Sequence, residues 1–120
     1  MTFTPYLYFD GQAEAALRYY AETFGADELT LMPYHEAPDS EALPKSDNIM
    51  YGHIMLGEAC LMASDVMPGV TAGPQQAVSI NFPVATVEEG QDLFDRLSEG
   101  GTVTMPYGPV FFSKGFGMVK

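Results

Sequence analysis

Residues 50–65 read MYGHIMLGEACLMASD, and this stretch decides the fold of the first half of the chain. Two apolar runs are separated by Gly57, which supplies the positive φ that a tight turn needs. The pattern predicts a hairpin of two strands over residues 49–56 and 59–64.

Counting back from the turn places His53 opposite Met62. Side chains alternate across a strand, so Tyr51, His53 and Met55 share one face of the hairpin. The other face, with Gly52, Ile54 and Leu56, is apolar and is expected to pack against a helix together with Ala59 and Leu61. His53 would then face an inner cavity, near Tyr6 or Tyr8.

The remaining sequence alternates strand and helix patterns. Apolar residues at helical spacing predict a helix over 12–25, with Asp10 as its N-cap, and a second helix over 86–101 that begins with a capping box at Thr86 to Glu89. The long polar segment 34–48 is either a binding lid or an exposed insertion. Strands are predicted over residues 2–9, 27–34, 77–84, 102–107 and 110–120.

The order strand-helix-strand-strand-strand is followed by a shorter repeat of the same pattern. This predicts an α+β fold and a single domain, 1–120, made of unit one (1–65), a linker (66–76) and unit two (77–120).

Charge and cysteine content limit the function classes. The 120 residues carry a formal net charge of −11, with five basic residues scattered along the chain, which argues against binding to nucleic acid or to anionic membranes. The single cysteine excludes an internal disulfide and a zinc-cysteine cluster. Neither a signal peptide nor a membrane span is visible, so a cytoplasmic location is expected.

Four stretches together resemble one known superfamily: PYLYFDGQAEAALRYYAETFGA (5–26), residues 50–65, LFDRLSEGGTVTMPY (93–107) and KGFGMVK (114–120). They are similar to the PhnB-like branch of the vicinal-oxygen-chelate superfamily, which includes glyoxalase I, bleomycin-resistance proteins and extradiol dioxygenases. This branch is also labelled 3-demethylubiquinone-methyltransferase-like.

The resemblance implies paired βαβββ units, each a curved sheet with its helix outside and a cavity inside. It also implies a homodimer and a small-molecule ligand. Relatives continue after the last matched stretch into a further strand, so unit two lacks its last strand in this sequence; either the sequence is trimmed or the strand is missing.

Metal-dependent members of the superfamily place ligands on the first and last strands of each unit. Carried over, these positions hold Tyr6 or Tyr8, Ser79 or Asn81, and Met62 or Ser64, while the fourth falls in the absent strand. Such side chains are weak ligands for a divalent transition metal. No metal ligand is therefore assigned. The cofactor stays unknown, and a divalent metal remains one of the alternatives. Glyoxalase I activity itself is not expected.

His53 is the candidate catalytic residue, and three interpretations stay open: a structural histidine in a hairpin, an acid-base residue or polar anchor for a ligand, and a metal ligand. The candidate ligand-binding residues are Tyr6, Tyr8, Tyr51, Met62 and Asn81. Cys60 is expected to be inert, because no cation or histidine adjoins it in sequence.

Two functions follow. One is a glyoxalase-like enzyme, lyase- or dioxygenase-like, acting on a small organic substrate with His53 in an acid-base role. The other is a binding protein of the bleomycin-resistance kind, in which an acidic, aromatic-lined cavity holds a cationic ligand. A methyltransferase is the weakest interpretation, since no glycine-rich strand-to-helix turn for adenosylmethionine is present.

Overall fold

The predicted hairpin is confirmed in the computed structural model, which describes residues 2–36 and 46–120. Strands β3 (Ile49–Leu56) and β4 (Ala59–Asp65) are antiparallel, and Gly57 adopts a φ of 60° in the turn. His53 lies opposite Met62, as the count from the turn predicted.

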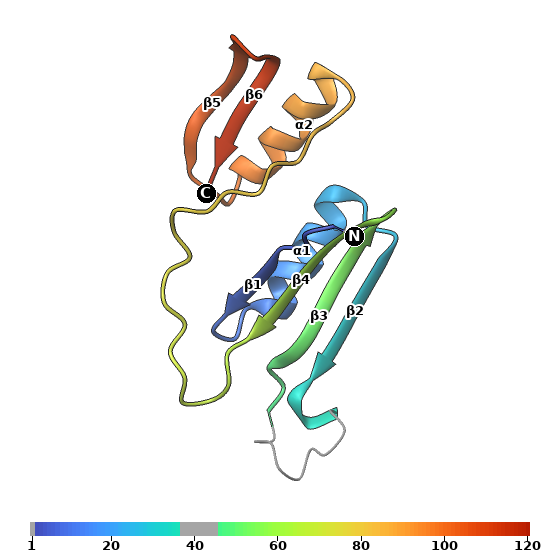
Figure 1. Cartoon of the computed structure of the whole chain (residues 1–120), viewed down its shortest axis with the longest axis vertical. Coiled ribbons are helices and arrows are strands. Elements are labelled where there is room, and N and C mark those ends of the chain that lie inside the picture. The colour runs from blue at the N-terminus through green and yellow to red at the C-terminus, as the bar shows by residue number, and fades with distance from the viewer. Residues whose placement is uncertain (1, 37–45) are drawn as a thin grey trace. The chain divides into compact units, whose positions relative to one another are not determined.

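The hairpin forms the centre of a four-stranded sheet in the order β1-β4-β3-β2 (Figure 1). Strand β1 (Tyr6–Phe9) runs parallel to β4, and β2 (Glu28–Pro33) runs antiparallel to β3. A short 3₁₀ helix, η1 (Tyr34–Glu36), follows β2. The predicted strand over residues 2–9 is therefore shorter than expected, and most of the predicted loop 34–48 lies outside the described residues.

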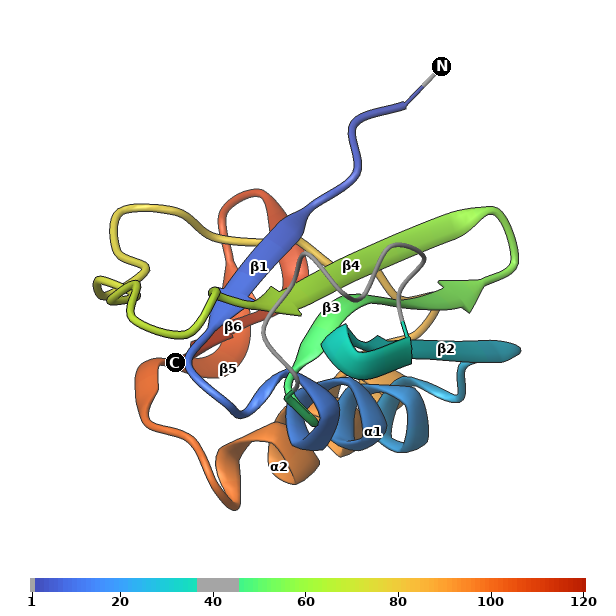
Figure 2. The ribbon, with the colours of Figure 1, turned by 90° about the horizontal axis from the view of Figure 1, so that it is seen from below.

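Helix α1 (Ala13–Phe24) covers one face of this sheet (Figure 2). Leu17 on the helix and Ile54 and Ala63 on the strands are fully buried at the centre of the core. Gly52 is where the helix comes nearest, since a Cβ at this position would lie 2.6 Å from a methyl group of Leu17. Burial of each large aliphatic side chain stabilises the fold by about 1.5–3 kcal/mol.

The opposite face of the sheet is called the open face below. Because Leu29, Ile54 and Leu61 pack into the core, their neighbours in each strand point the other way. The open face is therefore made of Tyr6, Tyr8, Glu28, Thr30, Met32, Tyr51, His53, Met55, Cys60, Met62 and Ser64.

A single buried carboxylate connects the sheet to the helix. Asp65, at the end of β4, is 2% exposed. Its Oδ1 accepts hydrogen bonds from the backbone N–H groups of Gly11, at 2.8 Å, and Ala13, at 3.0 Å, and its Oδ2 accepts one from Ile49 at 2.8 Å. The predicted cap was wrong: Gln12 is the N-cap residue and its side chain makes no cap hydrogen bond, so Asp65 takes the capping role that was expected of Asp10.

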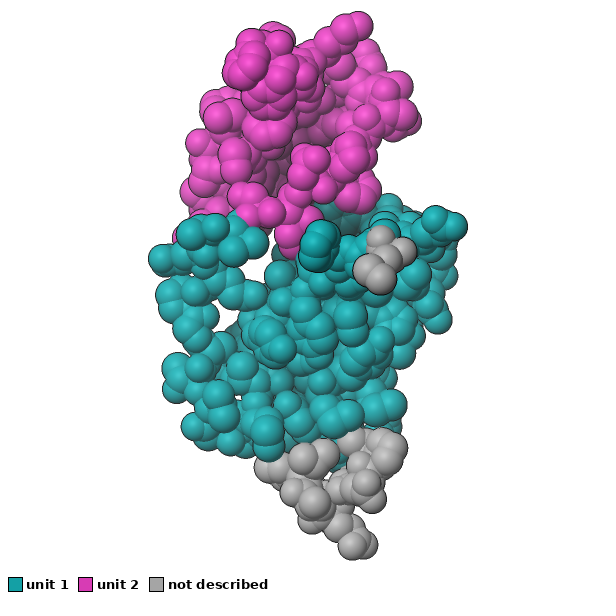
Figure 3. Space-filling view, in the orientation of Figure 1, with its two compact units in different colours: residues 1–78 teal, residues 79–120 magenta. Residues whose placement is uncertain are grey.

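The chain divides into two compact units, residues 1–78 and 79–120 (Figure 3). In the second unit, α2 (Val87–Ser98) packs on a hairpin of β5 (Val103–Val110) and β6 (Ser113–Val119). The predicted cap is confirmed here, because the Thr86 side chain accepts a hydrogen bond from the Glu89 N–H at 3.1 Å. The single-domain organisation stays a prediction.

The strand predicted over residues 77–84 is not present in the structure, which assigns this segment no strand. Its alternating apolar side chains are exposed instead: Val78 by 81% and Ile80 by 51%. Ala77 has a φ of 60°, so the segment begins with a left-handed residue, and Pro83 lacks the N–H that a sheet ladder uses. Alternation alone does not make a strand where no neighbouring strand bonds to it.

None of the helices in the described ranges is both long and apolar enough to cross a membrane.

The Asp65 carboxylate is expected to be the largest single polar contribution to the stability of unit 1. Asp65→Ala leaves three backbone N–H groups without their acceptor. Each buried N–H group without a hydrogen-bond partner costs about 1–3 kcal/mol, so the free energy of unfolding is expected to fall by about 3–5 kcal/mol. Urea unfolding, monitored by far-UV circular dichroism, measures this loss of unfolding free energy. Asp10→Ala is the matched control and should change the stability by less than about 0.5 kcal/mol; equal effects of the two changes would contradict the assignment.

Candidate functional site

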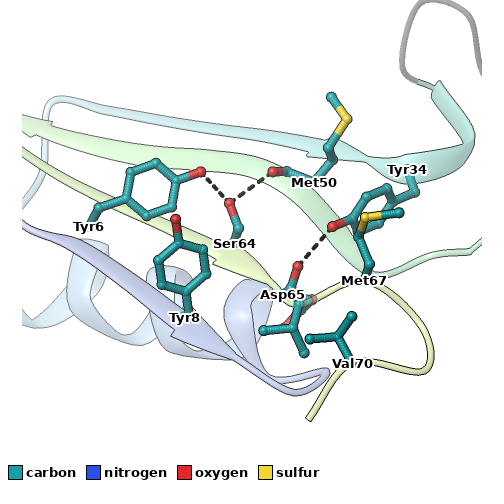
Figure 4. Close-up of a pocket in the computed structure, with 9 residues that line it drawn as sticks. Tyr6, Tyr8, Tyr34, Met50, Ser64, Asp65, Met67 and Val70 are labelled. Carbon is teal, nitrogen blue, oxygen red and sulfur yellow. Dashed lines mark hydrogen bonds between the residues drawn. The ribbon is translucent and has the colours of Figure 1, made fainter. Parts of the chain in front are cut away.

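A pocket of about 340 Å³ opens beside the end of the sheet in the first unit (Figure 4). Three strands, β1, β3 and β4, together with the start of η1 and the segment after β4, contribute to it. The lining residues are Tyr6, Tyr8, Tyr34, Met50, Ser64, Asp65, Val66, Met67 and Val70. Most of this wall is apolar or aromatic, with a few polar groups that can orient a ligand, which is the usual make-up of a small-molecule site.

A chain of hydrogen bonds fixes the Tyr6 side chain at the edge of the pocket (Figure 4). The Ser64 hydroxyl donates to the backbone carbonyl of Met50 at 2.8 Å, and the Tyr6 hydroxyl is hydrogen-bonded to Ser64 Oγ. Because the single Ser64 proton is directed to Met50, Tyr6 is the donor in its bond to Ser64. The Tyr6 oxygen therefore keeps its capacity to accept a hydrogen bond from a ligand.

Tyr8 extends the aromatic surface beside Tyr6. The two rings are stacked, with centroids 5.0 Å apart and planes inclined by 25°. Tyr8 is 52% exposed and Tyr6 38%, so the ring faces are accessible to a ligand. The Tyr8 backbone is held in place by the side chain of Gln75, which donates to its carbonyl at 2.7 Å and accepts from its N–H at 3.1 Å.

Tyr34 closes the inner end of the pocket. Its hydroxyl donates to the backbone carbonyl of Asp65 at 3.0 Å, and the residue is buried. Burial, followed by the neighbouring Asp65 and Tyr6, raises the pKa of Tyr34 above 10.0. Both carboxylate oxygens of Asp65 are bonded to backbone N–H groups, so this carboxylate acts as a structural brace behind the pocket wall.

The structure brings together some of the candidate residues but not others. Tyr6 and Tyr8 line the pocket, whereas His53, Tyr51 and Met62 lie on the same open face outside it. Met62 stands between Tyr6 and His53, because it is the register partner of both. Asn81 lies in the second unit, in an exposed segment that is not a strand in the structure.

His53 has two different environments at its two ring nitrogens. Nε2 lies 3.5 Å from Oε2 of Glu28, and the side chain is 17% exposed. Nδ1 is buried and has no hydrogen-bond partner among the described residues. The ring of Tyr51 meets the imidazole edge to face, with centroids 5.4 Å apart.

Cys60, on the same face, is partly buried. Burial, together with the charge of Glu28, raises the pKa of the Cys60 thiol above 9.0. The thiolate that a nucleophile requires is therefore disfavoured.

The superfamily's metal positions do not fit a divalent transition metal in this chain. Tyr6 and Ser64 use their hydroxyls in bonds to each other and to the Met50 carbonyl, and a tyrosine or serine hydroxyl is a poor ligand for such an ion. Within residues 2–36 and 46–120, no three His, Cys, Asp or Glu side chains gather closely enough to hold a metal ion.

Sequence reasoning missed Tyr34 and the pocket wall formed by Met50, Val66, Met67 and Val70. Tyr34 follows a proline at the end of a predicted strand, which is a signal for a change of chain direction but gives no indication of a pocket. The other wall residues depend on where the chain turns after β4, a feature that periodicity does not record.

Comparison with known proteins identifies the family. A family model described as 3-demethylubiquinone-9 3-methyltransferase matches residues 1–118. The chain is 30% identical to Protein YjdN from Escherichia coli over 130 residues, which covers 99% of this chain and 87% of YjdN.

Solved structures agree with this match. Protein PA1353 from Pseudomonas aeruginosa is 34% identical and superposes with a TM-score of 0.90, covering 99% of this chain and 88% of PA1353. A PhnB protein from Bacillus cereus, described as a putative 3-demethylubiquinone-9 3-methyltransferase, is 25% identical with a TM-score of 0.76, covering 99% and 90%. The chain therefore belongs to the 3-demethylubiquinone-9 3-methyltransferase family, as a PhnB-like member of the glyoxalase superfamily.

Proposed function

We propose that the protein binds a small aromatic cation in the pocket of unit 1. The observation that carries this proposal is the stacked Tyr6–Tyr8 pair, fixed at the pocket edge by the bond of Tyr6 to Ser64. Aromatic faces attract cations, by about 0.5–2 kcal/mol depending on desolvation. The net charge of −11 favours a positively charged ligand as well.

The polar geometry adds a requirement for N–H groups on the ligand. Tyr6 donates its own proton to Ser64 and so offers an acceptor oxygen to the pocket. A ligand with a planar ring and a charged N–H donor, such as an amidinium, can stack on the tyrosine rings and donate a hydrogen bond to this oxygen.

The methyltransferase activity in the family's name is not carried over to this chain. A cofactor with an anionic or polar group would use the amides of a strand-to-helix turn. In unit 1 the amides of Gly11 and Ala13 at this turn are already bonded to Asp65, so the turn does not fit adenosylmethionine.

Benzamidine and benzamide form a matched pair of probes, because the two molecules have nearly the same shape and only benzamidine is a cation at pH 7.5. Calorimetric titration is expected to show tighter binding of benzamidine. Loss of a hydrogen bond to a charged group costs about 1.5–3 kcal/mol, so Tyr6→Phe should weaken benzamidine binding about tenfold or more. Tyr8→Leu should remove most of the preference for the cation.

Tyr19→Phe, on α1, is the control variant and should bind benzamidine like the unmodified protein. Equal binding of benzamide and benzamidine, or an unchanged affinity in both Tyr6→Phe and Tyr8→Leu, would contradict the proposal.

A second candidate function is catalysis, and the His53–Glu28 pair is the observation that favours it. A carboxylate 3.5 Å from Nε2 can orient an imidazole. The imidazole faces the same side of the sheet as the pocket, with Met62 between them. A lyase- or dioxygenase-like reaction on a small organic substrate would use this pair for proton transfer.

For this second function, turnover of a panel of small organic substrates should be measured with and without added Zn²⁺, Ni²⁺ and Mn²⁺. General acid-base catalysis contributes about 10²–10⁴-fold, so His53→Ala is expected to lower kcat by about 100-fold or more. His35→Ala replaces the other histidine, which lies near Asp47 at the surface, and should leave kcat unchanged. Absence of turnover in the unmodified protein under every metal condition would exclude this candidate.

We also propose that the protein is a homodimer. Val78 and Ile80 are more than half exposed, and the two-stranded β5–β6 sheet has edges that can pair with a strand of another chain. Contact with a second copy would cover both features.

Light scattering coupled to gel filtration should give about twice the 13.1 kDa of one chain. The double change Val78→Ser and Ile80→Ser should shift the mass toward one chain, because it removes apolar area that the dimer buries. Phe3→Ser, at a fully exposed position before β1, is the control and should stay dimeric. A monomeric unmodified protein would refute the dimer.

A further inference from the structure

Four side chains with soft donor atoms form a compact group on the open face. Met55 lies opposite Cys60, and His53 lies opposite Met62, in successive pairs on the same side of the β3–β4 hairpin. Their neighbours Ile54 and Leu61 are packed into the core beneath α1, so these four side chains point away from it. The group combines one thiol, two thioethers and one imidazole.

The register places the four side chains within reach of a single ion. Directly opposite residues of an antiparallel pair have Cβ atoms about 4.5–5.5 Å apart. Successive residues on one face are separated by two steps of about 3.4 Å. The centre of this rectangle is therefore about 4 Å from each Cβ atom. A metal–sulfur bond of about 2.3 Å and a metal–nitrogen bond of about 2.0 Å allow all four side chains to meet there.

The surroundings of the group favour a cation. Nδ1 of His53 is buried without a hydrogen-bond partner among the described residues, and such an atom is costly unless it gains a partner. The Glu28 carboxylate adds negative charge at the edge of the group, 3.5 Å from Nε2 of His53 and opposite Met55 in the sheet. A bound cation would supply a partner for the imidazole and would be attracted by Glu28.

We propose that His53, Met55, Cys60 and Met62 form a binding site for Cu(I). Thioether and thiolate sulfur select soft ions such as Cu(I), whereas Zn²⁺ is held in proteins by thiolate, imidazole and carboxylate groups. Two of the four donors are thioethers, and this composition separates the group from a zinc site. The site lies outside the tyrosine-lined pocket and does not depend on the function proposed for that pocket.

The first measurement uses the unmodified protein and Cu(I) alone, under anaerobic conditions, in competition with a chromogenic Cu(I) chelator. One Cu(I) per chain is expected. With methyl-¹³C methionine, the NMR signals of Met55 and Met62 should shift on binding, while those of Met105 and Met118 in the second unit stay in place. Zn²⁺ at the same concentration should shift none of these methyl signals.

Variants then test the thioethers separately from the thiol. Loss of a residue that only orients a metal ligand already costs about 10- to 100-fold in affinity, so Met55→Leu and Met62→Leu should each weaken Cu(I) binding about tenfold or more. Leucine keeps the volume of methionine, and such exchanges usually cost less than about 1.5 kcal/mol of stability. Met118→Leu is the matched control and should bind Cu(I) with unchanged affinity.

Three results would overturn the proposal. The first is that the protein takes up no Cu(I) in competition with the chelator. The second is that Cys60→Ser abolishes binding while both methionine variants keep full affinity, which would show binding by a single thiol rather than by the four-residue site. Unshifted methyl signals of Met55 and Met62 at saturation would lead to the same conclusion without any variant.

Discussion

The fold of unit 1 depends on one buried carboxylate. Asp65 ends β4 and accepts three backbone hydrogen bonds from two distant parts of the chain, the start of α1 and the start of β3. A buried charge is tolerated only where its hydrogen bonds are made, and here both oxygens are occupied. This residue fixes where α1 begins, and the apolar side chains of the sheet then pack against the helix on one face while the other face stays open.

Features that depend on neighbouring residues could be predicted from the sequence, whereas features that depend on distant residues could not. Residues 49–65 were predicted with the correct turn and register, because alternation and one glycine are properties of neighbouring residues. The cap of α1 was misassigned to Asp10, since the actual cap comes from Asp65, more than fifty residues away. The strand over 77–84 was wrong for a related reason: alternation specifies which side chains share a face but not whether a neighbouring strand is available.

Some residues of the candidate site could be predicted from the sequence and others could not. Tyr6 and Tyr8 were predicted on the first strand as candidate ligand-binding residues. In the structure both side chains line the pocket. Tyr34 could not be predicted, because its role follows from a hydrogen bond to the backbone of Asp65 across the sheet. Whether the tyrosines bind a ligand and whether His53 is catalytic stay predictions, whereas their positions on the open face follow from the register.

The open face has two chemically different regions that meet at Met62. Hydroxyl and aromatic groups surround Tyr6, and sulfur and imidazole groups surround His53, while Met62 is the register partner of both residues. Two strand spacings of about 4.8 Å place the regions about 10 Å apart, which is close to one Debye length at 0.1 M salt. Cations bound at both places would therefore repel each other, and thermodynamic linkage requires each to weaken the binding of the other equally.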